Sequence, residues 1–153
     1  GDRARLAAFV RSGGGLDLAG DGGALHDSHR EMANALLAAG EIEIVPQGGA
    51  DWFPIAYNPD AVGGAGLAPN LLGTVTRFYG GRILAGVAHR NAFIEGVSGQ
   101  VFAGLWTETE LAGGRGRLSL GLISLWLGSS ENAPGIENLQ AFLQGAGETP
   151  PIR

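Results

Sequence analysis

The chain of 153 residues contains no cysteine and no lysine. The absence of cysteine excludes disulfides, cysteine-ligated zinc and every mechanism that depends on a thiolate. All ten basic residues are arginines scattered along the chain, and the net charge is −5. A clustered positive surface, which nucleic acid or an anionic membrane would require, is therefore not expected. Since no stretch approaches the roughly 20 apolar residues of a membrane span, we also expect no membrane insertion.

Hydrophobic residues make up 44% of the chain and charged residues 16%, a composition typical of a folded globular domain. The length fits one domain, which we place at residues 1–145, followed by a loose tail at 146–153. Because the chain starts almost inside a helix, we expect it to be part of a longer, exported precursor. The expected partners are then proteins or other domains of that precursor, and an extracytoplasmic location is preferred.

The two ends of the chain share one pattern, in which an apolar strand is followed by a polar loop and a helix. This pattern predicts an α/β fold in which helices cover an open sheet in three layers, mostly parallel, with one antiparallel hairpin at Gly113 and Gly114. Residues 46–70 contain too many glycines and prolines for a long regular element. Helices are expected at residues 2–12 with Asp2 as N-cap, from Asp27 or Ser28 to Gly40, and from Pro134; strands are expected at 16–19, 41–45, 75–79, 82–85, 100–106 and 117–123.

Ligands of open α/β sheets bind at the carboxyl ends of the strands. The polar loop after the first strand contains Asp21 and Gly22, and the loop after the last strand contains Ser124 and Asn132. We therefore predict these four residues as ligand-binding. Asp17, a carboxylate within the first strand, is expected at an edge or strand end that faces solvent, because burying an unpaired charge costs several kcal/mol. Residues 89–91 are expected to form a solvated connection.

A second cluster of candidate residues follows the first strand. His26 and His29 are three residues apart, so they would share one face of a helix, and Asp21 would arrive from the end of the strand. Two imidazoles and a carboxylate are sufficient to hold a divalent metal with one position open for water. The alternative needs no metal: Asp27 and Ser28 would be ordinary helix caps, and the two histidines would be surface residues beside a helix start. No cofactor other than this candidate metal is expected.

Several segments resemble class I glutamine-amidotransferase-like domains, in particular the non-catalytic branch that occurs as a module in larger bacterial proteins. The resemblance rests on residues 5–16 and 19–21 in the opening, 58–59, 73–75 and 78–81 in the middle, and 114–120 and 138–143 at the end. It implies a flavodoxin-like sheet. It does not carry glutaminase chemistry, which needs a thiolate and a histidine base. None of Ser98, Ser119, Ser124, Ser129 and Ser130 stands in the Gly-x-Ser-x-Gly elbow of a serine hydrolase.

Three functions remain open at the level of the sequence. The preferred one is a non-catalytic binding or scaffolding module. The second is a metal-dependent hydrolase that uses Asp21, His26 and His29. The third is a structural subunit that assembles as a homo-oligomer through a sheet edge, since the family places a strand before the first helix and this chain has none, which leaves an edge position open.

Overall fold

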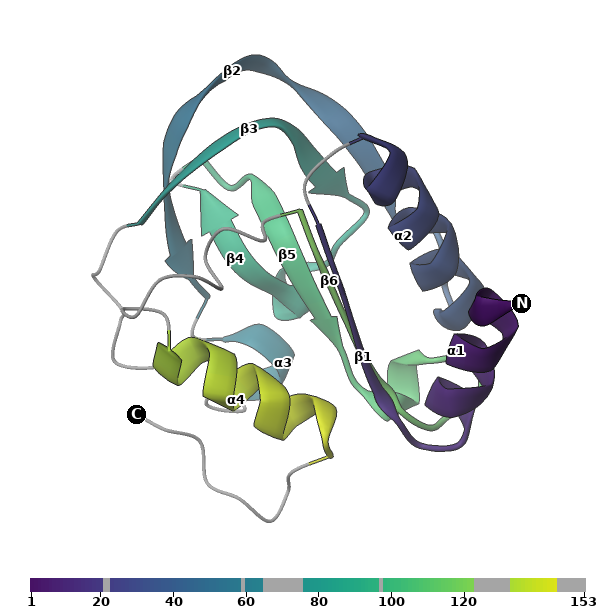
Figure 1. Ribbon diagram of the computed structural model, residues 1–153. Helices are drawn as coiled ribbons and strands as arrows, with labels where there is room; N and C mark the ends of the chain where they lie inside the picture. Colours follow the sequence, from purple (N-terminus) through teal and green to yellow (C-terminus); the bar gives the residue numbers. More distant parts are fainter. Residues whose placement is uncertain (21–22, 59, 65–75, 97, 123–132, 146–153) are drawn as a thin grey trace.

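A computed structural model of the chain describes residues 1–20, 23–58, 60–64, 76–96, 98–122 and 133–145 (Figure 1). The fold is mixed α/β, as the sequence predicts. The helices are α1 (Asp2–Arg11), α2 (Gly23–Leu36), α3 (Ala61–Gly64) and α4 (Ala133–Leu143), with short 3-10 turns η1 (His89–Asn91) and η2 (Glu108–Glu110); the strands are β1 (Gly15–Ala19), β2 (Glu43–Tyr57), β3 (Thr76–Ala85), β4 (Ala92–Gly96), β5 (Val101–Trp106) and β6 (Arg117–Gly121).

Within the described residues the strands form a six-stranded sheet in the order β1-β6-β5-β3-β2-β4. Only β1 and β6 run parallel, and the other pairs are antiparallel, so the prediction of a mostly parallel sheet is wrong. For the pairs β4–β5 and β5–β6 the reason is the length of the connection. A parallel crossover needs about a dozen residues or more, whereas the connections at residues 97–100 and 107–116 are shorter and return each strand antiparallel beside its predecessor.

Strands β2 and β3 form a long bent ribbon that arches over one end of the molecule (Figure 1). The sequence predicts irregular chain from Pro46 onward, yet β2 continues to Tyr57. Gly48 and Gly49 fall within a register shift between Pro46 and Asp51, as in a β-bulge, while Pro46 and Pro54 stay in register with β3. Strand β4 pairs with both β2 and β5, so this part of the sheet curls back on itself.

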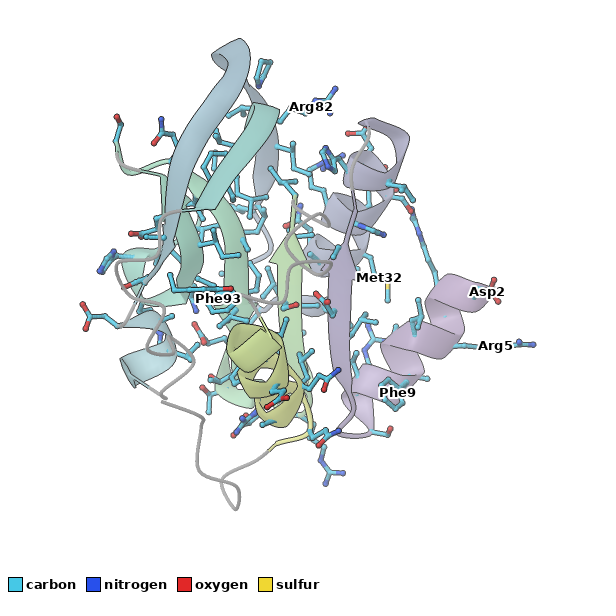
Figure 2. The ribbon with its side chains drawn as sticks, turned by 60° about the vertical axis from the view of Figure 1, so that its left-hand side comes forward. Asp2, Arg5, Phe9, Met32, Arg82 and Phe93 are labelled. Carbon is cyan, nitrogen blue, oxygen red and sulfur yellow. The ribbon has the colours of Figure 1, made fainter. Side chains whose placement is uncertain are left out.

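Helices cover both faces of the sheet where β1 and β6 lie. Helices α1 and α2 pack on one face with a core that includes Val10, Met32 and Leu118. Helix α4 lies on the other face, where Leu139 and Phe142 join a core around Phe102. Figure 2 shows Met32 between helix and sheet, Phe93 toward the interior, and Asp2 and Arg5 pointing outward. No described helix has the length and apolar character required to cross a bilayer.

Two predicted helix starts differ from the structure. Gly1 is the N-cap of α1, and Asp2 lies in the first turn, where its charge favours the positive end of the helix dipole. Helix α2 starts at Gly23, so Asp27 and Ser28 lie inside the helix and do not cap it. This earlier start places His26 and His29 fully within helical geometry, one turn apart.

Candidate functional site

The parallel pair β1–β6 brings two polar side chains together in the middle of the sheet edge. Asp17 and Ser119 are register partners, and the Ser119 hydroxyl donates a hydrogen bond to Asp17 Oδ1. Ser119 is buried, whereas Asp17 retains exposure because β1 has no strand other than β6 beside it in the described part of the sheet. Asp17 therefore occupies the edge position that the sequence predicts, with a partner that the sequence does not reveal.

The charge on Asp17 is only partly compensated. Burial raises the pKa of its carboxyl group, while the hydrogen bond from Ser119 and the nearby His29 act to lower it, and the net direction is upward. The carboxylate is thus held in a setting that favours its protonated form more than water does. A cation or hydrogen-bond donor that binds beside this carboxylate would lower its pKa.

Helix α2 carries His26 over the carboxyl end of β1. The side chain is 7% exposed, and its Nε2 lies 2.8 Å from the carbonyl oxygen of Gly20, a residue that directly follows the strand. A carbonyl only accepts, so Nε2 must carry the proton. In neutral His26 the lone pair is then on Nδ1, which is buried and has no hydrogen-bond partner among the described residues.

His29 lies beside the same turn of chain. A Cβ atom built on Gly20 would lie 3.4 Å from His29 Cε1, so the ring packs against this glycine. Burial and the neighbouring His26 lower the pKa of His29, and the opposing effect of Asp17 is smaller. His29 is therefore neutral near pH 7, and its Nδ1 is a second buried nitrogen without a partner in the described part of the chain.

Buried polar atoms are nearly always hydrogen-bonded, and one left unpaired costs about 1–3 kcal/mol. Two such atoms one helical turn apart, at the carboxyl end of a parallel strand pair, mark this region as the candidate site. Both nitrogens suit a hydrogen-bond donor or a divalent transition metal. Among the residues that the structure describes, no group of three metal-ligating side chains is assembled.

The sequence-predicted residues divide into two groups. His26 and His29 come together as predicted, on one face of α2. Asp21, Gly22, Ser124 and Asn132 lie outside the described residues, so the predicted loop contacts stay predictions. Sequence reasoning missed the participation of Asp17 and Ser119. A polar residue at the centre of each of two apolar strands was the available signal, but their pairing depends on sheet register, which the sequence did not provide.

No family model, no curated protein and no solved structure matches this chain.

Proposed function

We propose that this chain is a non-catalytic binding module with an amidotransferase-like, flavodoxin-like ancestry, whose ligand binds at the carboxyl end of β1 and β6. The observation that carries the proposal is the pair of buried imidazole Nδ1 atoms on His26 and His29, which have no partner in the described structure. A ligand that donates a hydrogen bond to each nitrogen, or a metal ion that both nitrogens bind, would satisfy them and recover the cost of burying them.

The chemistry of the neighbouring residues supports binding over catalysis. A serine nucleophile is activated by an imidazole that accepts its proton. Here the Ser119 hydroxyl donates to Asp17 instead, and Ser119 is buried within the sheet. The chain also has no cysteine, which excludes the thiolate route of the amidotransferases that it resembles.

A second candidate, the metal-dependent hydrolase, is favoured by one specific observation. Histidines that bind metals usually donate the other ring N–H to a carbonyl or a carboxylate, which fixes the tautomer. His26 has this arrangement, with Nε2–H on the Gly20 carbonyl and Nδ1 without a partner among the described residues. His26 and His29 would be the protein's nitrogen ligands, with Asp21 as the predicted carboxylate.

Metal titration separates the two candidates. Purified protein is stripped with a chelator and titrated with Zn²⁺, and bound metal is counted by elemental analysis in the wild type and in the double variant His26→Ala, His29→Ala. The matched control is His89→Ala, because His89 is the remaining histidine of the chain and is exposed on η1.

Each outcome has one meaning. Stoichiometric zinc that the double variant loses and His89→Ala retains, without turnover of esters or phosphoesters, supports a metal-binding module. Zinc-dependent turnover with the same pattern overturns the non-catalytic proposal in favour of the hydrolase. If the wild type binds no zinc, a zinc site is excluded. Proton-coupled ¹⁵N NMR of both rings then tests the site itself, because a bonded Nδ1 in the isolated protein would overturn the proposed site.

A further inference from the structure

A second region, separate from the histidines, contains a cavity of about 280 Å³ at the carboxyl end of α2. His26 and Leu37 are eleven residues apart, which corresponds to about 16 Å along a helix at 1.5 Å per residue. The cavity is therefore distinct from the site at the carboxyl end of β1. Its lining includes Leu37, Ile42, Ala88, Asn91, Trp106 and Glu110.

Direct hydrogen bonds fix the walls of this cavity. The Asn34 side chain donates to the carbonyl oxygen of Ile42 and accepts from its N–H, both at 2.8 Å, which ties the chain after α2 back to the helix. Ala38 N–H donates to the carbonyl oxygen of Glu110 at 3.0 Å. Gly86 has a φ of +83°, and a Cβ atom there would lie 2.6 Å from the carbonyl oxygen of Glu41, so only glycine fits this turn.

The polar wall of the cavity is formed by Asn91 and Glu110. Asn91 is 4% exposed, and its Nδ2 donates to the Leu105 carbonyl at 2.9 Å and to Glu110 Oε2 at 2.8 Å. Glu110 Oε1 already accepts from the N–H and hydroxyl of Thr107, and from Arg90. Asn91 Oδ1 has no hydrogen-bond partner among the described residues, and Glu110 Oε2 has only the bond from Asn91. Both oxygen atoms of this wall can therefore accept further hydrogen bonds from a ligand.

The other lining residues are apolar, and the one formal charge among the lining residues is the carboxylate of Glu110, whose Oε1 also forms an ion pair with the exposed Arg90 at 3.2 Å. Trp106, Leu37 and Ile42 are the largest apolar residues of the lining. Burial, the largest single effect, raises the pKa of Glu110, but the hydrogen bonds from Asn91, Thr107 and Arg90 together lower it below its ordinary value. Glu110 is therefore ionised at neutral pH.

We propose that this cavity binds a small organic cation, a primary ammonium group on a short apolar body. The ammonium would donate to Asn91 Oδ1 and Glu110 Oε2, and the apolar body would lie against Trp106. An ammonium group has three donors and no acceptor, which matches the acceptors left free on this wall. A volume of about 280 Å³ is at the lower end of the range for ligand pockets, so the ligand is of fragment size.

A matched pair of probes tests the role of the charge. 2-Phenylethylammonium and 2-phenylethanol have nearly the same shape and differ in the cationic head group. Binding to the full chain is measured by chemical-shift changes in ¹⁵N-labelled protein, with dissociation constants on the order of a millimolar expected for ligands of about ten atoms. We expect the ammonium to bind about tenfold or more tightly than the alcohol, because hydrogen bonds to charged groups are the stronger ones.

Two variants and one control variant identify the binding site. Glu110→Gln removes the charge and should abolish the preference for the ammonium. Ala88→Leu leaves the polar wall intact and fills space in the cavity, so it should weaken both probes, whereas Ala112→Leu, at an exposed residue outside the lining, should change neither. No saturable binding of either probe, equal binding of both, or a preference that persists in a folded Glu110→Gln protein would each overturn the proposal.

Discussion

Replacement of His26 by leucine should leave the stability of the isolated protein nearly unchanged, although His26 is buried. The buried Nδ1 atom, which has no partner among the described residues, costs about 1–3 kcal/mol, and its removal recovers this amount. Loss of the 2.8 Å bond from Nε2 leaves the buried carbonyl oxygen of Gly20 without this donor, which also costs about 1–3 kcal/mol. The two effects should cancel to within about 1 kcal/mol in the free energy of unfolding, which corresponds to a change in Tm of no more than about 2–4 °C for a chain of this size.

Urea unfolding followed by tryptophan fluorescence measures this change. Met32→Leu is the control, because Met32 is buried on the same helix and the exchange conserves volume, with an expected cost below about 1.5 kcal/mol. With a saturating ligand the wild type should be more stable than His26→Leu, since only the wild type gains stability from binding. A loss of 2 kcal/mol or more in His26→Leu without ligand would show that Nδ1 is satisfied in the native protein, and the argument for a site there would fail.

Three further perturbations test other parts of the structure. Asp17→Asn should stabilise the protein at pH 7. Since the folded pKa of Asp17 is raised, the wild type regains this difference in the free energy of unfolding as the pH falls through that pKa. Urea unfolding at several pH values between 7 and 3 should therefore show the stabilities of the two proteins converge. Gly116→Ala should destabilise the protein by several kcal/mol, because a Cβ atom there would clash with the Val10 carbonyl oxygen. The control Gly114→Ala, also at positive φ but in open space, should cost only about 1 kcal/mol. Equal losses of stability in thermal unfolding would contradict the clash. Asn58→Ala should cost about 2–4 kcal/mol, because two carbonyl oxygens that Asn58 bonds lose their donor, and a neutral result in chemical denaturation would refute this role.

Hydrophobic periodicity was sufficient to predict most elements near both ends of the chain. The apolar positions Met32, Leu36 and Leu37 fall on one helical face, and all three are buried in the structure. Strands β1, β5 and β6 lie close to their predicted bounds. Periodicity predicts these elements because each one buries a single face against a neighbour, so apolar residues recur along the sequence at the spacing of that face.

The middle of the chain shows where local signals fail. Strand β2 contains two prolines and two glycines, and β3 contains Gly80 and Gly81. Each strand is held by pairing with the other, which overrides the weak strand propensity of these residues. Residues 89–91 were expected to be solvated, yet Asn91 is buried because Glu110, far along the chain, accepts a hydrogen bond from its side chain.

In the candidate site, some features follow from local sequence patterns and others depend on contacts between distant parts of the chain. The spacing of His26 and His29 follows from the sequence, since residues three apart share a helix face. Their burial does not, because it depends on the early start of α2 and on the close packing of the ring of His29 against Gly20. Asp17 and Ser119 are 102 residues apart and meet only through strand register. Pairing of the β1 edge with a second copy of the chain stays a prediction, as β6 is its one strand partner in the described residues.

The electrostatics around Gly20 favour recognition of a ligand over turnover. Burial raises the pKa of Asp17 and lowers the pKa of His29, so both groups are driven toward their neutral forms. A general acid and base pair requires one group that holds a proton and one that accepts it within reach of a substrate, with a nucleophile between them. In the described residues the hydroxyl beside this pair is bonded to the carboxylate and buried. Among the described residues neither Nδ1 atom has a hydrogen-bond partner, so a ligand that bonds to these atoms would remove the cost of burying them unpaired.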